Sequence, residues 1–240
     1  MLVALRSLLY LLFLSLTTFV MAPLLYLLKW IIPFPPLARM GNLWGRLNLE
    51  AARIICGLSY RLHGWENLPQ DNAIVLCKHQ SAWETIALRG LLPACTTWVI
   101  KRELLWIPFF GWGMAAFDPI ALDRKAGRQA IKQLLVEGRK WLEAGRWVII
   151  FPEGTRVAPG ERVKYNLGGA MLAEKSGYPV VPIAHNAGVF WRRRSLLKYP
   201  GVIDLVVGEP ILTRGLKAAE INQRVEDWIE SQLASLPQQR

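Results

Sequence analysis

Acidic residues are missing from the first 49 positions of this 240-residue chain, and they are scarce in the whole of it. With 29 Lys and Arg against 18 Asp and Glu, the formal net charge is +11. A surplus of this size implies an anionic partner: a nucleic acid, a phospholipid surface or a phosphorylated substrate. Because the acid-free segment also contains the longest apolar run, it favours lipid over nucleic acid.

Cysteine is also rare. The chain has three, Cys56, Cys77 and Cys95, with no C-x-x-C pair and no neighbouring histidine cluster. This odd, scattered set argues against a zinc site and fits a reducing compartment. Cys77 lies two residues before His79, so a thiol nucleophile is an alternative, although strand alternation favours its burial. No G-x-S-x-G motif of a serine nucleophile accompanies this histidine.

Charged residues are absent from Ser7 to Leu28, a run of 22 residues. A helix that rises about 1.5 Å per residue would cross a hydrocarbon core of about 30 Å over this length. We predict an apolar membrane helix over residues 7–32, which the prolines of residues 33–36 end. The run is longer than the apolar part of a signal peptide, about 7 to 15 residues, and no small-residue cleavage site follows it.

Residues 37–62 are expected to form an amphipathic basic helix. Apolar residues recur there every three or four positions, and Arg39, Arg46 and Arg53 share the opposite face. This pattern is typical of a helix that touches anionic headgroups, and the alternative is a helix packed on the globular core. We assign residues 1–62 to a membrane-associated helical arm.

Two insertions of this arm are possible. A single span would end near Lys29 and place the amino terminus outside, whereas two helices in one leaflet would keep it cytosolic. Pro23 within the apolar run and the tight proline turn favour the one-leaflet arrangement. Basic residues are more frequent after the apolar run than before it, so the positive-inside rule predicts a cytosolic globular part.

Residues 63–240 are predicted to form an α/β domain with a largely parallel sheet and flanking helices, because short apolar runs alternate with amphipathic stretches. No internal repeat interrupts this alternation. We expect strands at residues 73–77, 96–100, 119–122, 147–151, 180–184 and 202–207, and helices at residues 81–92, 125–144, 168–176 and 216–236.

A histidine follows the first of these strands. Glu84 comes five positions after His79, and its carboxylate can take the Nδ1 proton and leave Nε2 free as a base. Such a base would activate a hydroxyl group of the substrate itself, without a covalent enzyme intermediate. The alternative is structural, because Ser81 and Glu84 also fit the S-x-x-E capping box of a helix.

A second candidate segment follows the strand at residues 147–151. Glu153, Gly154 and Arg156 come together in one turn, where the guanidinium can bind a phosphate and the glycine allows close approach of backbone. An ordinary turn with a solvated arginine is the alternative. These residues alone do not decide between the two.

Taken together, the two segments resemble the glycerolipid acyltransferase family, most of all its bacterial 1-acylglycerol-3-phosphate acyltransferases. The first family motif is a histidine and an acid spaced as in residues 79–84, and the third is F-P-E-G-T-R, matched at residues 151–156. The second motif is similar to residues 101–111 with 120–124, and the fourth to residues 180–183. The resemblance covers roughly residues 63–212, with the motifs in the family's order.

This sequence departs from the family pattern at two positions. The usual acid of the first motif is Asp, whereas position 84 is Glu, which is longer by one methylene. Lys78 stands where many relatives carry Asn. Neither departure removes the histidine.

The resemblance implies an enzyme that transfers an acyl chain from acyl-CoA or acyl carrier protein to the free sn-2 hydroxyl of 1-acyl-sn-glycerol-3-phosphate, giving phosphatidic acid. It implies no metal and no bound cofactor. The lipid bilayer is an expected partner and nucleic acid is not. The expected location is the bacterial inner (cytoplasmic) membrane, with the active domain on its cytosolic side.

The resemblance also implies roles for single residues. His79 and Glu84 are the expected catalytic pair. The other expected site residues are Arg124, Arg156, Lys101 and Lys164 for the substrate phosphate, and Glu153, Gly154 and Thr155 for substrate positioning.

Two alternative functions remain: the same chemistry on another lysolipid, such as a lyso-ornithine lipid or lysophosphatidylglycerol, and a non-catalytic membrane-tethered binding protein.

Overall fold

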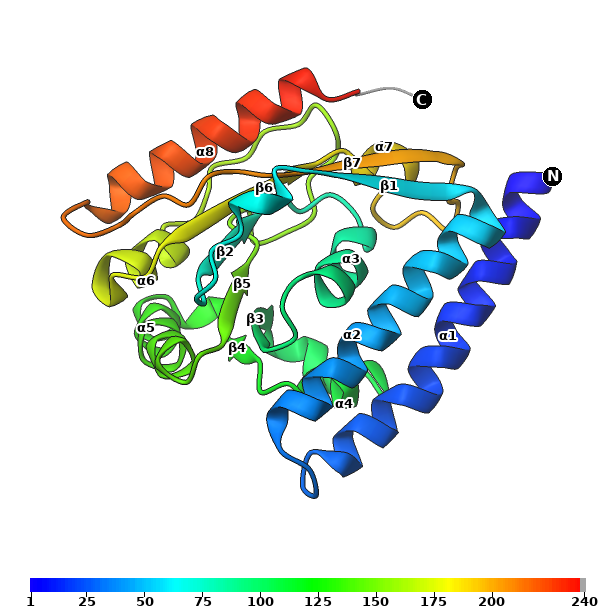
Figure 1. The fold of residues 1–240 in the computed structure, drawn as a ribbon, viewed down its shortest axis with the longest axis horizontal. Helices are drawn as coiled ribbons and strands as arrows, with labels where there is room; N and C mark the ends of the chain where they lie inside the picture. The colour runs from blue at the N-terminus through cyan, green and yellow to red at the C-terminus, as the bar shows by residue number, and fades with distance from the viewer. Residues whose placement is uncertain (238–240) are drawn as a thin grey trace.

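The computed structural model describes residues 1–237, and the described part contains one sheet with helices on both faces (Figure 1). The strand order is β1-β7-β6-β2-β5-β3-β4, and every neighbouring pair is parallel except β6 and β7. The predicted α/β fold with a largely parallel sheet is therefore confirmed. The strands are β1 Leu58–His63, β2 Ile74–Cys77, β3 Thr96–Lys101, β4 Ile120–Leu122, β5 Trp147–Ile150, β6 Val180–His185 and β7 Gly201–Val207.

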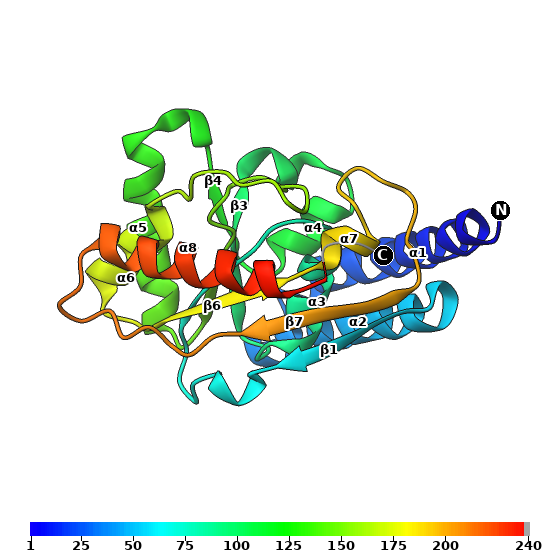
Figure 2. The same ribbon diagram turned by 90° about the horizontal axis from the view of Figure 1, so that it is seen from above.

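Strands β2 to β7 lie where the apolar runs predicted them, with ends that differ by at most one residue. Every residue of β2, β5 and β6 is buried, because helices cover both faces of the sheet. Helices α5, α6 and α8 pack on one face, with α8 running alongside β6 (Figure 2), and α3 packs on the other. These helices are α3 Trp83–Leu91, α5 Arg128–Glu143, α6 Gly168–Ser176 and α8 Ala218–Ser235.

The prediction of one helix over residues 37–62 is wrong at its carboxyl end. Helix α2, Phe34–Ala51, continues only through a π-helical turn, Ala52–Cys56, and Gly57 then leaves the helix with φ +67. Residues 58–63 form β1, which pairs with β7 about 140 positions later in the chain. Pairing with the distant β7 makes residues 58–63 a strand. These residues therefore belong to the sheet and not to the expected arm.

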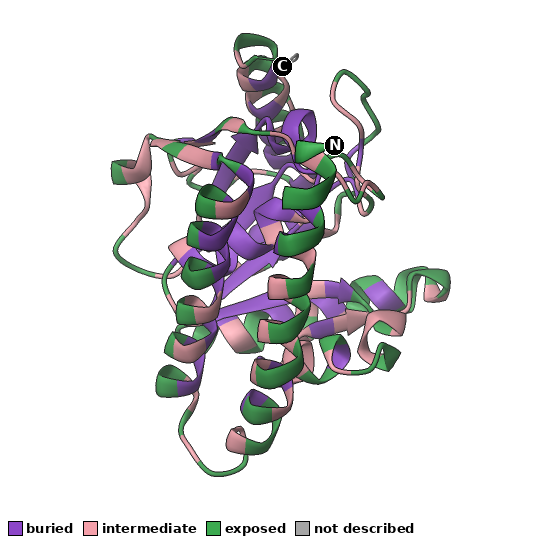
Figure 3. Cartoon of the chain, turned by 90° about the vertical axis from the view of Figure 1, so that its right-hand side faces the viewer, coloured by how far each residue is buried: buried purple, intermediate pink, exposed green. Residues whose placement is uncertain are grey.

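The apolar helix α1, Leu2–Leu28, begins and ends earlier than the predicted 7–32, and residues 29–33 turn the chain into α2. Pro23 lies within α1 without ending it. Helix α1 is long and apolar enough to cross a membrane, with a mean hydropathy of 2.2 in its most apolar 18 residues. Figure 3 shows α1 and α2 side by side, with the outer surface of α1 largely exposed.

The globular domain contacts α1 near both of its ends. The Ser7 hydroxyl accepts a hydrogen bond from the Lys198 backbone N–H at 2.9 Å. In the turn after the helix, Lys29 Nζ lies 2.6 Å from the Asp118 carboxylate. The helix therefore lies along the domain instead of projecting from it. Short helical segments were also found that had not been predicted. They include α4 Phe110–Ala115, which packs on α1, α7 Ala187–Phe190, and the 3-10 segments Trp65–Asn67 and Arg102–Trp106.

Helices α2 and α3 touch backbone to backbone. A Cβ atom added to Gly45 would lie 2.5 Å from the Gly90 backbone nitrogen, which is closer than real Cβ contacts come. Helices α2 and α3 can come this close only because Gly45 and Gly90 have no side chains. The close contact fixes α3, and with it the acid at the start of α3, against the helical hairpin.

Candidate active site

The two candidate segments lie next to each other because β2 and β5 are parallel neighbours, with Ile74 opposite Val148. The chain therefore leaves both strands at the same edge of the sheet, where α/β proteins bind ligands. The His79 ring stacks on Phe151, with 3.9 Å between ring centroids and 12° between planes. Two segments some seventy positions apart thus form one site.

His79 and Glu84 form a hydrogen-bonded pair. His79 Nδ1 lies 2.8 Å from Glu84 Oε1, and the same oxygen accepts hydrogen bonds from the backbone N–H groups of Gln80 at 2.8 Å and Ser81 at 2.7 Å. An acceptor at Nδ1 selects the tautomer whose Nε2 carries the free lone pair. Within residues 1–237 no protein group bonds Nε2, and the side chain is 15% exposed, so a substrate can reach it.

The carboxylate of Glu84 is fully buried yet remains ionised. Burial raises its pKa, but the positive charge that His185 or His79 can carry, together with hydrogen bonds from His79 and Ser81, outweighs that effect and leaves the pKa below its usual value. His185 Nε2 lies 3.8 Å from the second carboxylate oxygen and hydrogen-bonds the Lys78 carbonyl at 2.9 Å. Sequence reasoning did not identify His185, although its position at the end of a buried strand was a signal.

The capping interpretation of the same residues holds only in part, because the N-cap of α3 is Ala82 and no side chain makes a capping hydrogen bond there. The Trp83 backbone N–H donates to the Ser81 hydroxyl at 3.1 Å, and the Ser81 N–H donates to Glu84. One carboxylate therefore both binds the backbone that leads into α3 and orients His79. The two interpretations of this segment do not exclude each other.

Cys77 is an unsuitable nucleophile. It is fully buried, and burial raises the pKa of its thiol well above the usual range, with the charges of Glu84 and Glu153 adding to the effect. A thiol of this kind stays protonated and unreactive. The thiol alternative finds no support in the structure.

A cavity of about 260 Å³ opens beside His79. Its polar lining includes Lys101, Arg124, Gly154 and Arg156, and the rest of the lining is mostly apolar. An apolar pocket of about 90 Å³ lies next to it, between α1, α2 and α4. Both spaces share the lining residues Thr18, Trp44, Thr85, Trp98, Phe110 and Met114.

The predicted phosphate ligands do not all gather at this cavity. Lys101, Arg124 and Arg156 line it, and the Arg124 guanidinium donates a hydrogen bond to the Gly154 carbonyl oxygen. Lys164 is exposed on the loop after β5, and it is not among the residues that line the cavity. Thr155 is likewise exposed and outside the lining. The structure thus brings three of the four cations to the histidine.

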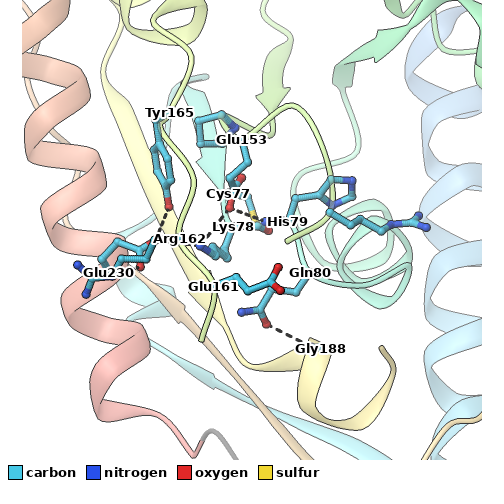
Figure 4. A network of polar contacts seen from close by, with 12 residues as sticks. Cys77, Lys78, His79, Gln80, Glu153, Glu161, Arg162, Tyr165, Gly188 and Glu230 are labelled. Atoms are coloured by element: carbon cyan, nitrogen blue, oxygen red, sulfur yellow. Dashed lines mark hydrogen bonds and ion pairs between the residues drawn. The ribbon is translucent and has the colours of Figure 1, made fainter. Parts of the chain in front are cut away.

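Glu153 is buried and is absent from the cavity lining. Its Oε1 accepts a hydrogen bond from the His79 backbone N–H at 3.3 Å and lies 3.4 Å from Lys78 Nζ (Figure 4). The carboxylate therefore braces the histidine segment. Lys78 itself was not predicted as a site residue, although a charge at the end of a buried strand was a signal for it.

The chain is similar in sequence to known acyltransferases. A sequence profile of the Acyltransferase family matches residues 59–186. The chain is 42% identical over 237 residues to 1-acyl-sn-glycerol-3-phosphate acyltransferase of Pseudomonas aeruginosa, covering 97% of this chain and 92% of the relative. It is 29% identical over 204 residues to the protein of that name from Cocos nucifera, covering 85% and 65%.

The fold is also similar to a crystal structure. The 1-acyl-sn-glycerophosphate (LPA) acyltransferase PlsC from Thermotoga maritima superimposes with a TM-score of 0.79 over 96% of this chain and 94% of that one, at 21% identity. The chain therefore belongs to the acyltransferase family and is an enzyme that transfers acyl groups.

Proposed function

We propose that this enzyme transfers an acyl chain from acyl-CoA or acyl carrier protein to the sn-2 hydroxyl of 1-acyl-sn-glycerol-3-phosphate, producing phosphatidic acid for phospholipid biosynthesis. One observation carries the proposal: an oriented histidine base, three cations and an apolar lining share one cavity. The acceptor has the same three parts, namely a hydroxyl, a phosphate and an acyl chain. The names of the similar proteins from Pseudomonas aeruginosa and Cocos nucifera support this acceptor.

The chemistry follows from the free Nε2 of His79. Nε2 takes the proton of the acceptor hydroxyl while the hydroxyl oxygen attacks the thioester carbonyl carbon. The tetrahedral intermediate then expels the thiolate, which receives the proton from the imidazolium. Glu84 stabilises the imidazolium between these steps. No bond to the enzyme forms, and general-base help of this kind is worth about 10²- to 10⁴-fold in rate.

The apolar surface supports a membrane location for the acceptor. Leu8, Leu12 and Leu16 of α1 are each about half exposed or more. Exposed Trp112 extends this surface beyond α1, because Phe109 contacts both Phe19 and Trp112. Aromatic and aliphatic side chains of this kind lie in the interfacial part of a bilayer. We propose the cytosolic leaflet of the bacterial inner membrane as the site of action.

The contacts of α1 with the domain near both ends favour the one-leaflet arrangement. A helix that is held along the domain by Ser7 and Lys29 cannot also run straight away from it across a bilayer. In the one-leaflet arrangement α1 and α2 both lie in the cytosolic leaflet, and the amino terminus stays cytosolic. The apolar pocket between these helices would then open close to the lipid chains.

The first prediction concerns the substrates. Purified protein in detergent should acylate lysophosphatidic acid with acyl-CoA or acyl carrier protein as donor, in preference to lysophosphatidylglycerol and a lyso-ornithine lipid. The product and its rate are followed with a radiolabelled acyl group. A preference for either of the other acceptors would replace the proposed acceptor and keep the acyl transfer.

The same panel tests the phosphate ligands. Arg156→Ala should lower kcat/KM for lysophosphatidic acid about ten- to hundredfold, because a charge-assisted contact of about 1.5 to 3 kcal/mol is lost. Arg124→Ala should act in the same direction, with an added effect from its lost bond to Gly154. The matched control is Arg139→Ala, which removes an exposed ion pair on α5. An equal loss on a phosphate-free acceptor would refute the assignment of both arginines.

A labelling experiment tests the insertion of the arm. Leu2→Cys introduces an exposed thiol. The background carries only Cys95→Ser, because Cys56 and Cys77 are buried and should not react with the reagent. An impermeant thiol reagent added to intact cells should leave this variant unlabelled and should react once the cells are opened. Cells with Cys95→Ser alone give the background. Labelling from outside would establish a single span.

A further inference from the structure

Lys78 is a buried charge that the proposed chemistry does not use. It follows β2 directly and is 1% exposed. Since side chains alternate along an extended chain, Lys78 points to the face opposite His79. Its Nζ lies 2.8 Å from Glu230 Oε1 of α8 and 3.4 Å from Glu153 Oε1 (Figure 4).

Glu153 joins this ion cluster to the catalytic histidine. The oxygen that faces Lys78 also accepts the backbone N–H of His79 at 3.3 Å, and the other carboxylate oxygen is buried without a partner in the described residues. Glu230 is held in turn by the Tyr165 hydroxyl at 3.1 Å and by Arg162 Nε at 3.2 Å. A continuous polar path thus runs from α8 to the backbone of the base.

The charge of Glu153 depends on its surroundings. Burial raises its pKa to about 7, and the positive charge of Lys78 opposes that rise. The other titratable groups that interact with it are Cys77 and Tyr165, and Glu230 shares the Lys78 ammonium with it. Burial raises the pKa of both the Cys77 thiol and the Tyr165 hydroxyl, so both stay neutral near pH 7. Lys78 is therefore the cation that favours the ionised form of Glu153.

We propose that Lys78 is a positioning residue for acyl transfer, which holds Glu153 as a carboxylate on the His79 backbone N–H, while Glu230 of α8 competes for the same ammonium. The proposal rests on the proposed function of His79 as the base. Ionised Glu153 accepts the N–H strongly and fixes the backbone from which the imidazole projects. Protonated Glu153 is a weaker acceptor, so the backbone that carries the imidazole is held less firmly. Through Glu230, helix α8 thereby influences the charge of Glu153 from the opposite face of the sheet.

The test is the pH dependence of kcat. Lys78→Met removes the cation and keeps the volume of the side chain, so Glu153 takes up a proton at higher pH. The acid limb of the kcat profile should move up by about 1 to 3 pH units, because an opposite charge within reach lowers a carboxyl pKa by that amount. At high pH the rate should approach that of the wild type. The matched control is Arg139→Met, which breaks the exposed pair with Glu143 and should leave the limb in place.

Two further variants separate positioning from a loss of stability. Glu230→Gln leaves Glu153 as the remaining carboxylate beside Lys78, so the acid limb should move down or stay. Glu153→Gln combined with Lys78→Met replaces the titrating acceptor by an amide oxygen, so the upward shift should disappear. If these residues only stabilised the fold, Lys78→Met and Glu230→Gln would not differ in the direction in which the acid limb moves. Glu153→Gln would also not suppress the shift that Lys78→Met causes.

An unchanged acid limb in Lys78→Met would overturn the proposal, and so would an equal upward shift in Glu230→Gln. If Lys78→Met does not fold, Lys78→Met with Glu230→Met gives the same test, because a buried ion pair can be replaced by two apolar side chains. The assay uses the acceptor that the wild type prefers in the panel. A wrong choice of lysophosphatidic acid is thus distinguishable from a wrong assignment of Lys78.

Discussion

Replacement of His79 by alanine should lower kcat by about 10²- to 10⁴-fold, the usual contribution of a general base. The variant should still fold and bind membranes, since Glu84 keeps its two backbone donors and α1 is untouched. The expected change lies in kcat, because the base acts in the transition state and the cations and apolar lining still bind substrate. Steady-state kinetics of the purified variant with lysophosphatidic acid measure it.

The chain contains a matched control for this experiment. His63 Nε2 lies 2.8 Å from the Asp204 carboxylate, the same separation as in the His79–Glu84 pair, but it is on β1 and outside the cavity. His63→Ala should keep kcat within about twofold of the wild type, as expected for a partly exposed pair remote from the chemistry. Near-normal turnover in folded His79→Ala would refute the proposed mechanism.

The main features of the sheet and site could be predicted from sequence for a simple reason. Apolar runs of four to six residues, bounded by turns, are predicted as buried strands. In a largely parallel sheet, the segments after such strands gather at one edge. That rule brings residues 79–84 and 151–156 together without any knowledge of their contacts. The structure adds that β2 and β5 are direct neighbours, which lets His79 stack on Phe151.

The remaining features depend on contacts between distant parts of the chain. Residues 58–63 carry a pattern that suits a helix or a strand, and only pairing with β7 makes them β1. Glu230 lies 152 positions from Lys78, so no local pattern connects them. The resemblance to the family implied that Glu153 positions the substrate. Its burial and its bond to the His79 backbone favour the bracing role.

The position of Glu84, where the family usually has Asp, leads to the second large expected effect. Glu84→Gln keeps the length and the capping oxygen of the side chain, because glutamine also serves in the capping box. It removes the negative charge that stabilises the imidazolium and selects the tautomer of His79. We expect kcat to fall by at least about 10²-fold with little change in thermal stability, as measured by kinetics and calorimetry on the same preparation.

Glu84→Asp provides the comparison that separates charge from length. Aspartate keeps the charge but ends one methylene short of the oxygen position that now accepts three donors. Activity should fall by less than in Glu84→Gln. The short loop 80–82 can move towards the shorter aspartate carboxylate, whereas an amide cannot supply the missing negative charge. If Glu84→Gln instead lost stability and kept its rate per folded molecule, Glu84 would serve the helix alone. His79 would then require another group to orient it, and the buried His185, 3.8 Å from the second carboxylate oxygen, would be the next residue to replace.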